Sequence, residues 1–210
     1  SSFIKSKLAS DVQIIKSIYG SLGFNFVSVK TKLEKYSENR LDIIFSIEKG
    51  KKTKISKIKF IGDKKIKTRR LQDIIVSEES KFWKILTKNT YLNNKNIDLD
   101  KRLLKNYYRS IGYYDVQIVS SNAIVKDNDT SEITYNISAG ERYIIKKIST
   151  KISEVLDKSA FVDLNKSYKK IIGKYYSPFL VKTLLENLDD LIIDNDLQFI
   201  EHSVNEIIND

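Results

Sequence analysis

A seven-residue phrase occurs twice in this chain, and its spacing constrains everything around it. IYGSLGF begins at Ile18, and YYRSIGY begins at Tyr107, 89 residues later. A period of about 90 residues is the size of a compact domain and exceeds the unit of a solenoid repeat. The chain is therefore expected to be an array of small domains in tandem.

Each phrase marks the predicted end of a helix and the turn into a strand. Apolar residues recur three and four positions apart over 10–19 and 99–111, as in amphipathic helices. Glycine is favoured just after the last helical turn because it adopts a left-handed conformation without the cost of a side chain. Structural turns are therefore assigned to Gly23 and Gly112, and to the glycines that close the following hairpins, Gly50 and Gly140.

The hairpins are predicted from alternating apolar residues. In the first copy Leu41, Ile43, Phe45 and Ile47 alternate with polar residues, which predicts a hairpin with one buried face. A third copy is fainter: 184–192 repeats the helical spacing, and Asp196 stands where the other copies have glycine. Short polar side chains tolerate the left-handed region better than others, so the turn is expected to persist there. A strand is also expected over 143–148.

One full unit reads strand, helix, helix, strand, strand. The expected class is α+β, with tandem β-α-α-β-β domains in which a small three-stranded sheet is covered by two helices. On this interpretation residues 52–142 are one complete domain. Residues 1–51 are the C-terminal part of a preceding domain and residues 143–210 the N-terminal part of a following one, so that the first and last domains are truncated.

Charge and residue composition argue against several classes of function. The net charge is +10, but most basic residues are lysine, whereas phosphate and base recognition favours arginine. The balance is interpreted as a compositional bias on a solvated surface. Gly20-Ser21-Leu22-Gly23 has the GxxG form of an RNA-binding KH loop, but a strand pattern follows it directly, and nucleic-acid binding is not expected. The chain has no cysteine and one histidine, so no catalytic triad, metal site or cofactor is predicted, and the protein is not expected to be an enzyme.

The β-α-α-β-β order, the Tyr-x-Ser-x-Gly-Phe/Tyr helix end and the phrases at 48–50 and 139–143 resemble POTRA (polypeptide-transport-associated) domains. The segment 79–86 and the residues after it resemble the middle POTRA domain of BamA-type outer-membrane β-barrel assembly factors, especially alphaproteobacterial ones. The three domains would then be the second, third and fourth of the string. The third copy departs most, because it lacks the Gly-Phe pair and holds the sole proline, Pro178.

The resemblance implies a periplasmic portion of an outer-membrane protein. It implies as partners unfolded outer-membrane β-barrel precursors and the lipoproteins of the assembly machinery. Two alternatives stay open: the POTRA region of a related translocation or secretion barrel, and, from a different class, a basic RNA-binding repeat protein.

Three candidate surfaces follow from the residues. The strand after Gly112 is expected at a sheet edge, where an extended client segment would add as a further strand; Val116 and Ile118 would anchor it, and Asp115, Gln117 and Val119 would border the docking edge. Phe82 and Trp83 are either a partner patch or a seal over the corner between the helices, and the seal is the favoured interpretation. The lysines between 49 and 67 either contact an anionic membrane surface or guard a strand edge.

Overall fold

The computed structural model describes residues 2–37, 40–83, 88–127, 129–197 and 200–208. The chain divides into two compact units. One contains residues 1–107 and 116–139, and the other contains residues 108–115 and 140–210. The glycine turn of the first phrase thus lies in the first unit, and that of the second phrase in the second unit.

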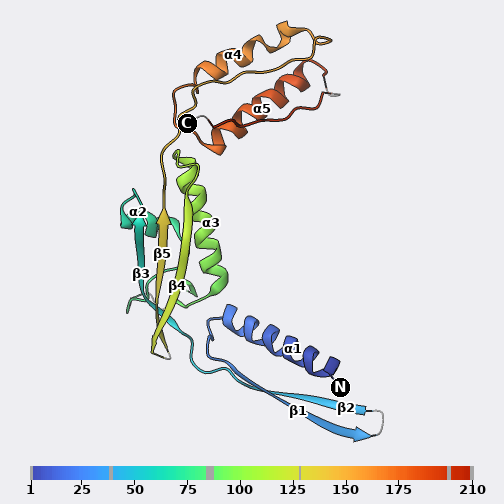
Figure 1. The fold of residues 1–210 in the computed structure, drawn as a ribbon, viewed down its shortest axis with the longest axis vertical. Helices are drawn as coiled ribbons and strands as arrows, with labels where there is room; N and C mark the ends of the chain where they lie inside the picture. Colours follow the sequence, from blue (N-terminus) through green and yellow to red (C-terminus); the bar gives the residue numbers. More distant parts are fainter. Residues whose placement is uncertain (1, 38–39, 84–87, 128, 198–199, 209–210) are drawn as a thin grey trace. The chain divides into compact units, whose positions relative to one another are not determined.

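The first unit contains the three-stranded sheet on which the complete repeat is built (Figure 1). Its strands are β3 (Lys54–Asp63), β4 (Gln117–Asp127) and β5 (Thr130–Ser138), in the order β3-β5-β4. The central strand, β5, is parallel to β3 and antiparallel to β4. This arrangement leaves β3 and β4 as the two edges.

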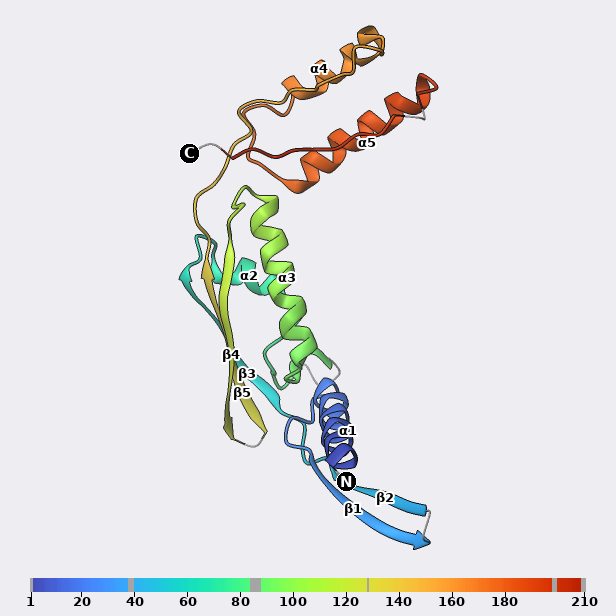
Figure 2. The same ribbon diagram turned by 45° about the vertical axis from the view of Figure 1, so that its right-hand side comes forward.

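Two helices and a short 3-10 turn connect β3 to β4. They are α2 (Thr68–Ile74), η1 (Lys88–Thr90) and α3 (Asn94–Ser110). Both α-helices lie on the same face of the sheet (Figure 2). The predicted α+β class, with a small three-stranded sheet and two covering helices, is confirmed.

The core of the repeat lies between this sheet face and the helices, because β5 alternates strictly between buried and partly exposed residues. Ile133, Tyr135 and Ile137 are buried, and Leu71 of α2 and Leu104 of α3 are buried opposite the sheet. Fully burying a large apolar side chain contributes about 1.5–3 kcal/mol. The repeat is thus stabilised chiefly by this layer.

A buried carboxylate connects α3 to the rest of the repeat. Asp100 is fully buried, and one of its oxygens accepts hydrogen bonds from the Val76 and Ser77 N–H groups at 2.6 and 3.2 Å. Its other oxygen accepts the Tyr135 O–H at 2.6 Å. Burial, together with the nearby Asp100 charge, raises the pKa of Tyr135 far above its usual value, so this hydroxyl stays protonated and donates.

Residues 2–48 form α1 (Ser2–Ser21), β1 (Ser28–Ser37) and β2 (Arg40–Glu48). The two strands pair as an antiparallel hairpin. By the 89- to 90-residue spacing these elements are the counterparts of α3, β4 and β5. The described residues before β3 include no counterpart of β3 or α2.

The predicted buried face of this first hairpin is wrong. Ile43 and Ile47 are 44% and 40% exposed, whereas their counterparts Ile133 and Ile137 are at most 1% exposed. Leu41 is equally exposed, and Phe45 is only partly covered. Alternation marks which side chains share a face, but burial of that face also needs the neighbouring strand and helix that the complete repeat supplies.

The second unit contains η2 (Lys158–Phe161), α4 (Val162–Lys169) and α5 (Pro178–Asp194). The predicted helix over 184–192 is part of α5. Asp196 has a φ of 54°, so the predicted left-handed turn is also present. Gln198 and Phe199, which follow this turn in the third copy, lie outside the described residues.

The strand predicted over 143–148 is wrong. Among the described residues of this unit, β pairing is limited to a single bridge between Ile144 and Tyr175. Nearby, Tyr176 N–H donates to the Tyr143 carbonyl and Gly173 N–H to that of Ile145. In the complete repeat, β3 pairs along its length with β5. No described strand of the second unit pairs with residues 143–148 in this way.

Candidate functional site

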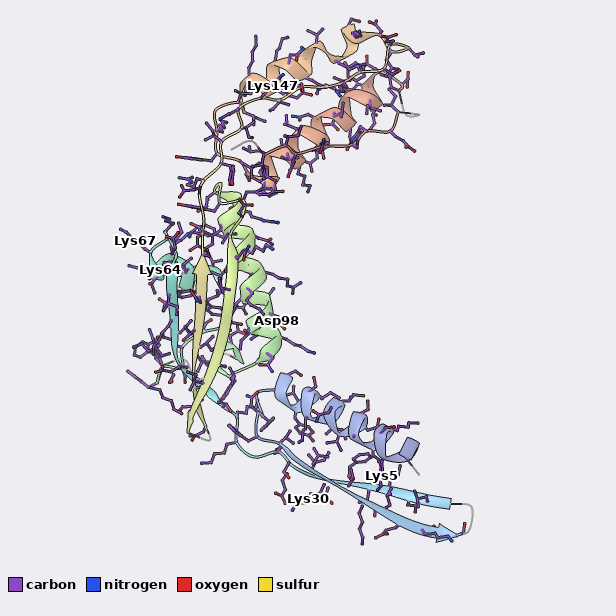
Figure 3. The ribbon with its side chains drawn as sticks, in the orientation of Figure 1. Lys5, Lys30, Lys64, Lys67, Asp98 and Lys147 are labelled. Atoms are coloured by element: carbon purple, nitrogen blue, oxygen red, sulfur yellow. The ribbon has the colours of Figure 1, made fainter. Side chains whose placement is uncertain are left out.

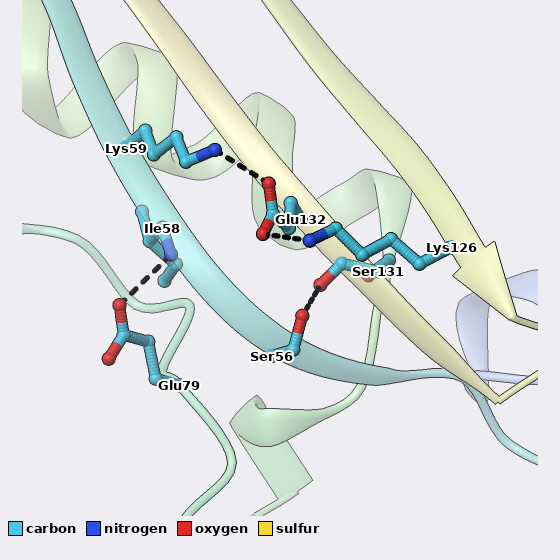
Figure 4. A network of polar contacts seen from close by, with 7 residues as sticks. All are labelled: Ser56, Ile58, Lys59, Glu79, Lys126, Ser131 and Glu132. Atoms are coloured by element: carbon cyan, nitrogen blue, oxygen red, sulfur yellow. Dashed lines mark hydrogen bonds and ion pairs between the residues drawn. The ribbon is translucent and has the colours of Figure 1, made fainter.

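The two edges of the sheet differ. At the β3 edge, the segment after α2 lies alongside the strand: Ser80 N–H donates to the Ile55 carbonyl at 2.7 Å, and Ile58 N–H donates to the Glu79 carboxylate at 3.0 Å (Figure 4). These bonds occupy backbone groups that an edge strand otherwise presents to solvent. The middle of β3 is therefore covered and is a poor acceptor for an additional strand.

The β4 edge is open within the described part of the chain, because no described strand lies beside β4 on the side away from β5. Val119 and Ile124 of this strand are 62% and 61% exposed. Its pairing with β5 shifts register twice, between Ile118 and Ser120 and between Val125 and Asp127. Such irregularities bend an edge strand locally and separate stretches of regular backbone. β4 is accordingly the candidate acceptor strand.

The residues predicted to border the docking edge lie at the start of this strand. Asp115 precedes β4, and its carboxylate accepts the Tyr143 O–H at 2.7 Å. Gln117 is the first residue of β4, opposite Ser138, and is exposed. Val119 lies at the first register shift. Val116, predicted to anchor the strand, is 1% exposed, and Ile118 is partly buried.

An ion-pair cluster on the face away from the helices ties the three strands together. Glu132 of β5 contacts Lys59 of β3 and Lys126 of β4, each at 2.7 Å (Figure 4). Hydrogen bonds from Lys126 and Lys59 lower the pKa of Glu132 to about 2. This cluster was not predicted from the sequence. The alternation of β5 places Glu132 on the polar face, but the residue pattern alone does not give the register that selects its partners.

Phe82 and Trp83 form an exposed aromatic pair after α2. Their side chains are 85% and 63% exposed, and the rings meet edge to face with centroids 4.5 Å apart. The Lys81 ammonium lies 5.6 Å from the centre of the Trp83 ring. The favoured interpretation of the pair as a buried seal is therefore wrong. Residues 84–86, the rest of the predicted insertion, lie outside the described residues.

Part of the chain matches a known protein family. Residues 53–140 match the POTRA family, described as a surface antigen variable number repeat. Residues 53–140 form a POTRA domain. The predicted resemblance is thus confirmed for the part of the chain that holds the three-stranded sheet.

Two of the relatives of the chain are BamA proteins. It is 26% identical over 148 residues to the outer membrane protein assembly factor BamA of Neisseria meningitidis, covering 70% of this chain and 19% of that protein. It is 24% identical over 191 residues to BamA of Buchnera aphidicola, covering 89% and 29%. The chain thus spans less than a third of either relative. A crystal structure of Haemophilus influenzae BamA POTRA3-5 is similar with a TM-score of 0.48 and 18% identity, covering 87% of this chain and 68% of that one. The chain that holds this POTRA domain is therefore similar to part of the BamA proteins.

The turn glycines of the POTRA domain and its neighbours have positive φ angles. These are 92° at Gly23, 64° at Gly50, 105° at Gly112 and 72° at Gly140. Side chains disfavour this region by about 1–2 kcal/mol, which explains the residue type. The angles alone do not distinguish turns that merely reverse the chain from turns that also make contacts.

The lysines are spread around the POTRA domain. Lys64 and Lys67 lie in the turn between β3 and α2 (Figure 3), where the Lys64 ammonium donates to Thr68 at 2.8 Å and Lys67 is exposed. By contrast, Lys52 contacts an aromatic ring, and Lys59 forms an ion pair with Glu132. Among the described residues, no helix is both long enough and apolar enough to cross a membrane.

Proposed function

We propose that this chain belongs to the periplasmic region of an outer-membrane protein assembly factor, where it receives unfolded β-barrel precursors as added strands along β4. The observation that supports this most directly is the asymmetry of the sheet. Glu79 and Ser80 cover the β3 edge, while no described strand lies outside β4. The BamA relatives supply the class of client.

Strand addition suits a receiver of many different clients. Hydrogen bonds between main chains do not depend on client sequence, and the side chains that alternate along the edge add modest selectivity. Val119 and Ile124 offer exposed apolar side chains beside such a strand. Precursors of β-barrels are rich in segments of strand-forming composition, so they match this edge in both backbone and side-chain character.

The same proposal assigns each of three parts of the chain to a different POTRA domain. Residues 1–51 would be the end of a second POTRA domain, 52–142 a third, and 143–210 the start of a fourth. The correspondence of α1-β1-β2 with α3-β4-β5 supports the first assignment. The helix α5, followed by a left-handed turn at Asp196, supports the last.

Partner contacts are proposed elsewhere on the surface. The exposed pair Phe82 and Trp83 is the proposed docking point for an assembly lipoprotein, since exposed aromatic residues are common anchors of interfaces. Exposed lysines such as Lys67 are proposed to contact an anionic membrane surface. The role is that of a non-enzymatic platform.

Site-specific crosslinking tests strand addition. A photoreactive amino acid is placed in the full chain at Val119 on the open edge or at Lys57 on the covered edge, and the protein is mixed with a urea-unfolded β-barrel protein diluted into buffer. Crosslinks are expected from position 119 and not from 57. Equal crosslinking from both positions would refute edge-selective binding.

Two substitutions sharpen this experiment. Ser121→Pro removes a backbone donor on the open side of β4, because Ser121 stands opposite Tyr135, whose backbone groups face β3, whereas Ser121→Thr changes the side chain and keeps the donor. Crosslinking at 119 is expected to be lost in the first variant and retained in the second, with the urea midpoint of each measured as a check on the fold. Loss of client capture with a steep dependence on salt, together with capture of RNA, would instead favour the nucleic-acid alternative.

A further inference from the structure

The same hydrogen-bonded turn ends α1, α3 and α5. In each case the left-handed residue donates its N–H to the carbonyl three residues earlier, and the next residue donates to the carbonyl five earlier. This is the pattern of a helix C-terminal motif. The distances are 3.0 and 3.0 Å at Gly23, 3.2 and 3.0 Å at Gly112, and 3.1 and 2.9 Å at Asp196.

In the first unit this turn contacts the residues that begin the POTRA domain. The Gly23 carbonyl accepts the Thr53 N–H at 3.0 Å, and the Thr53 carbonyl accepts the Leu92 N–H at 2.8 Å. Tyr91 forms a β-bridge with Lys54. A Cβ on Gly23 would lie 3.1 Å from the Cβ of Tyr91, tighter than ordinary van der Waals contact.

The second unit repeats these contacts one for one. The Gly112 carbonyl accepts the Tyr143 N–H at 2.9 Å, and the Tyr143 carbonyl accepts the Tyr176 N–H at 2.8 Å. Tyr175 forms a β-bridge with Ile144. A Cβ on Gly112 would lie 3.2 Å from the Cβ of Tyr175.

A cation lies between two aromatic rings in both units. The Lys52 ammonium is 5.2 Å from the ring centre of Phe24 and 5.1 Å from that of Tyr91. In the second unit the Arg142 guanidinium is 5.5 Å from the ring centre of Tyr113 and 3.3 Å from that of Tyr175. One ring of each pair follows the glycine, and the other belongs to the bridge tyrosine.

We propose that this arrangement is a docking joint by which the turn of one repeat binds the start of the next. The partner of the turn is a basic residue, a following residue that donates its N–H, and a tyrosine about 32–38 residues further along. Glycine serves two needs at once, the positive φ and the close approach of tyrosine. We call this the glycine–tyrosine joint, formed by Gly23, Lys52, Thr53 and Tyr91 in the first unit and by Gly112, Arg142, Tyr143 and Tyr175 in the second.

The third turn lacks the small residue that the joint requires. Asp196 carries a Cβ where Gly23 and Gly112 bring a tyrosine to within contact distance, and Leu197 replaces the aromatic residue that follows each glycine. The Asp196 turn therefore does not accept a tyrosine in the same way. The joint is a property of the first two turns and not of every helix end of this kind.

Matched glycine substitutions in the full chain test the joint. Gly112→Ala and Gly140→Ala both place a side chain at a positive φ, at 105° and 72°, but a Cβ at Gly140 would meet nothing within 4 Å. Hydrogen exchange of the Tyr143 and Tyr176 amides, followed by NMR, is the measurement. Loss of the joint is expected to speed exchange at both amides about tenfold in Gly112→Ala relative to Gly140→Ala, since each hydrogen bond and cation–aromatic contact contributes modestly. Equal exchange in the two variants would refute the joint.

Two further measurements keep the test decisive if Gly112→Ala does not fold. Tyr175→Leu keeps the Cβ and removes the ring beneath Arg142, and is expected to speed exchange at Tyr176 severalfold; an unchanged rate would contradict the proposal. The first unit offers an independent repetition. Gly23→Ala is expected to speed exchange at the Thr53 and Leu92 amides far more than Gly50→Ala, whose Cβ would lie at an ordinary 3.7 Å from its nearest neighbour.

Discussion

Removing the Asp100 carboxylate is expected to destabilise the POTRA domain more than any single surface change. The residue is fully buried, and three donors from two separate parts of the fold converge on it: the N–H groups of the consecutive residues Val76 and Ser77, and the Tyr135 O–H. With alanine at this position, all three donors lose their acceptor. Ser77 and Tyr135 are themselves buried, so water cannot replace the lost acceptor there without opening the fold.

The magnitude follows from these contacts. An unsatisfied buried donor costs about 1–3 kcal/mol, so Asp100→Ala should lower the free energy of unfolding by about 2–6 kcal/mol. Tyr135→Phe removes one charge-assisted hydrogen bond and should cost about 1.5–3 kcal/mol. The ring remains to stack on Phe60, at a centroid distance of 5.6 Å. The double variant should cost less than the sum, with a coupling of about 1–3 kcal/mol, because both changes break the same bond.

Urea unfolding followed by circular dichroism measures these free energies, and the chain supplies its own control. Asp11 of α1 is the counterpart of Asp100, but it is half-buried, and Phe45, which has no hydroxyl, stands at the counterpart of Tyr135. Asp11→Ala should change stability by less than about 0.5 kcal/mol, as is usual away from buried networks. A comparable loss in Asp11→Ala, or additive effects of Asp100→Ala and Tyr135→Phe, would refute the network as the cause.

Three other outcomes are expected. The pKa of Glu132 is lowered to about 2, below the value of about 4.3 in the unfolded chain, so its contribution to stability is present above about pH 4 and is lost as the pH falls toward 2. Glu132→Gln should therefore flatten the dependence of the urea midpoint on pH in this range. An unchanged slope would contradict the role of this carboxylate. Thr53→Val should raise the unfolding free energy by about 1 kcal/mol, because the buried Thr53 hydroxyl lacks a hydrogen-bond partner among the described residues; a lower melting temperature in calorimetry would show that the hydroxyl is satisfied. Trp83 should show red-shifted fluorescence that is fully quenched by iodide or acrylamide in the native state, and a blue-shifted, protected spectrum would contradict its exposure.

The sequence predicted the class and element order of the fold because both depend on local patterns. Alternating apolar residues indicated the strands of the hairpins, and the repeated glycine phrase indicated where the long helices end. Burial was predicted less well. The same alternation occurs at Ile43 and Ile47, yet these residues stay exposed, because burial depends on elements distant in sequence.

The candidate site was predictable only in part. That β4 lies at a sheet edge follows from the order of elements, but the covering of β3 depends on Glu79 and Ser80, which lie in an irregular segment without periodicity. The repeated phrase also gave no indication that its glycines contact a tyrosine. Tyr91 and Tyr175 do not belong to the repeated phrase, and their approach to Gly23 and Gly112 depends on the folded structure.

The covering of β3 by the segment after α2 has a consequence for how many chains one domain can hold. A sheet with two free edges has a valency of two and can link one extended chain to another, which is the first step of open-ended polymerisation. With Ser80 N–H bonded to the Ile55 carbonyl and Glu79 bonded to Ile58, this sheet has a valency of one. An unfolded chain added along β4, as proposed, would then be a terminal addition, so that two client chains would not be brought together across the same sheet.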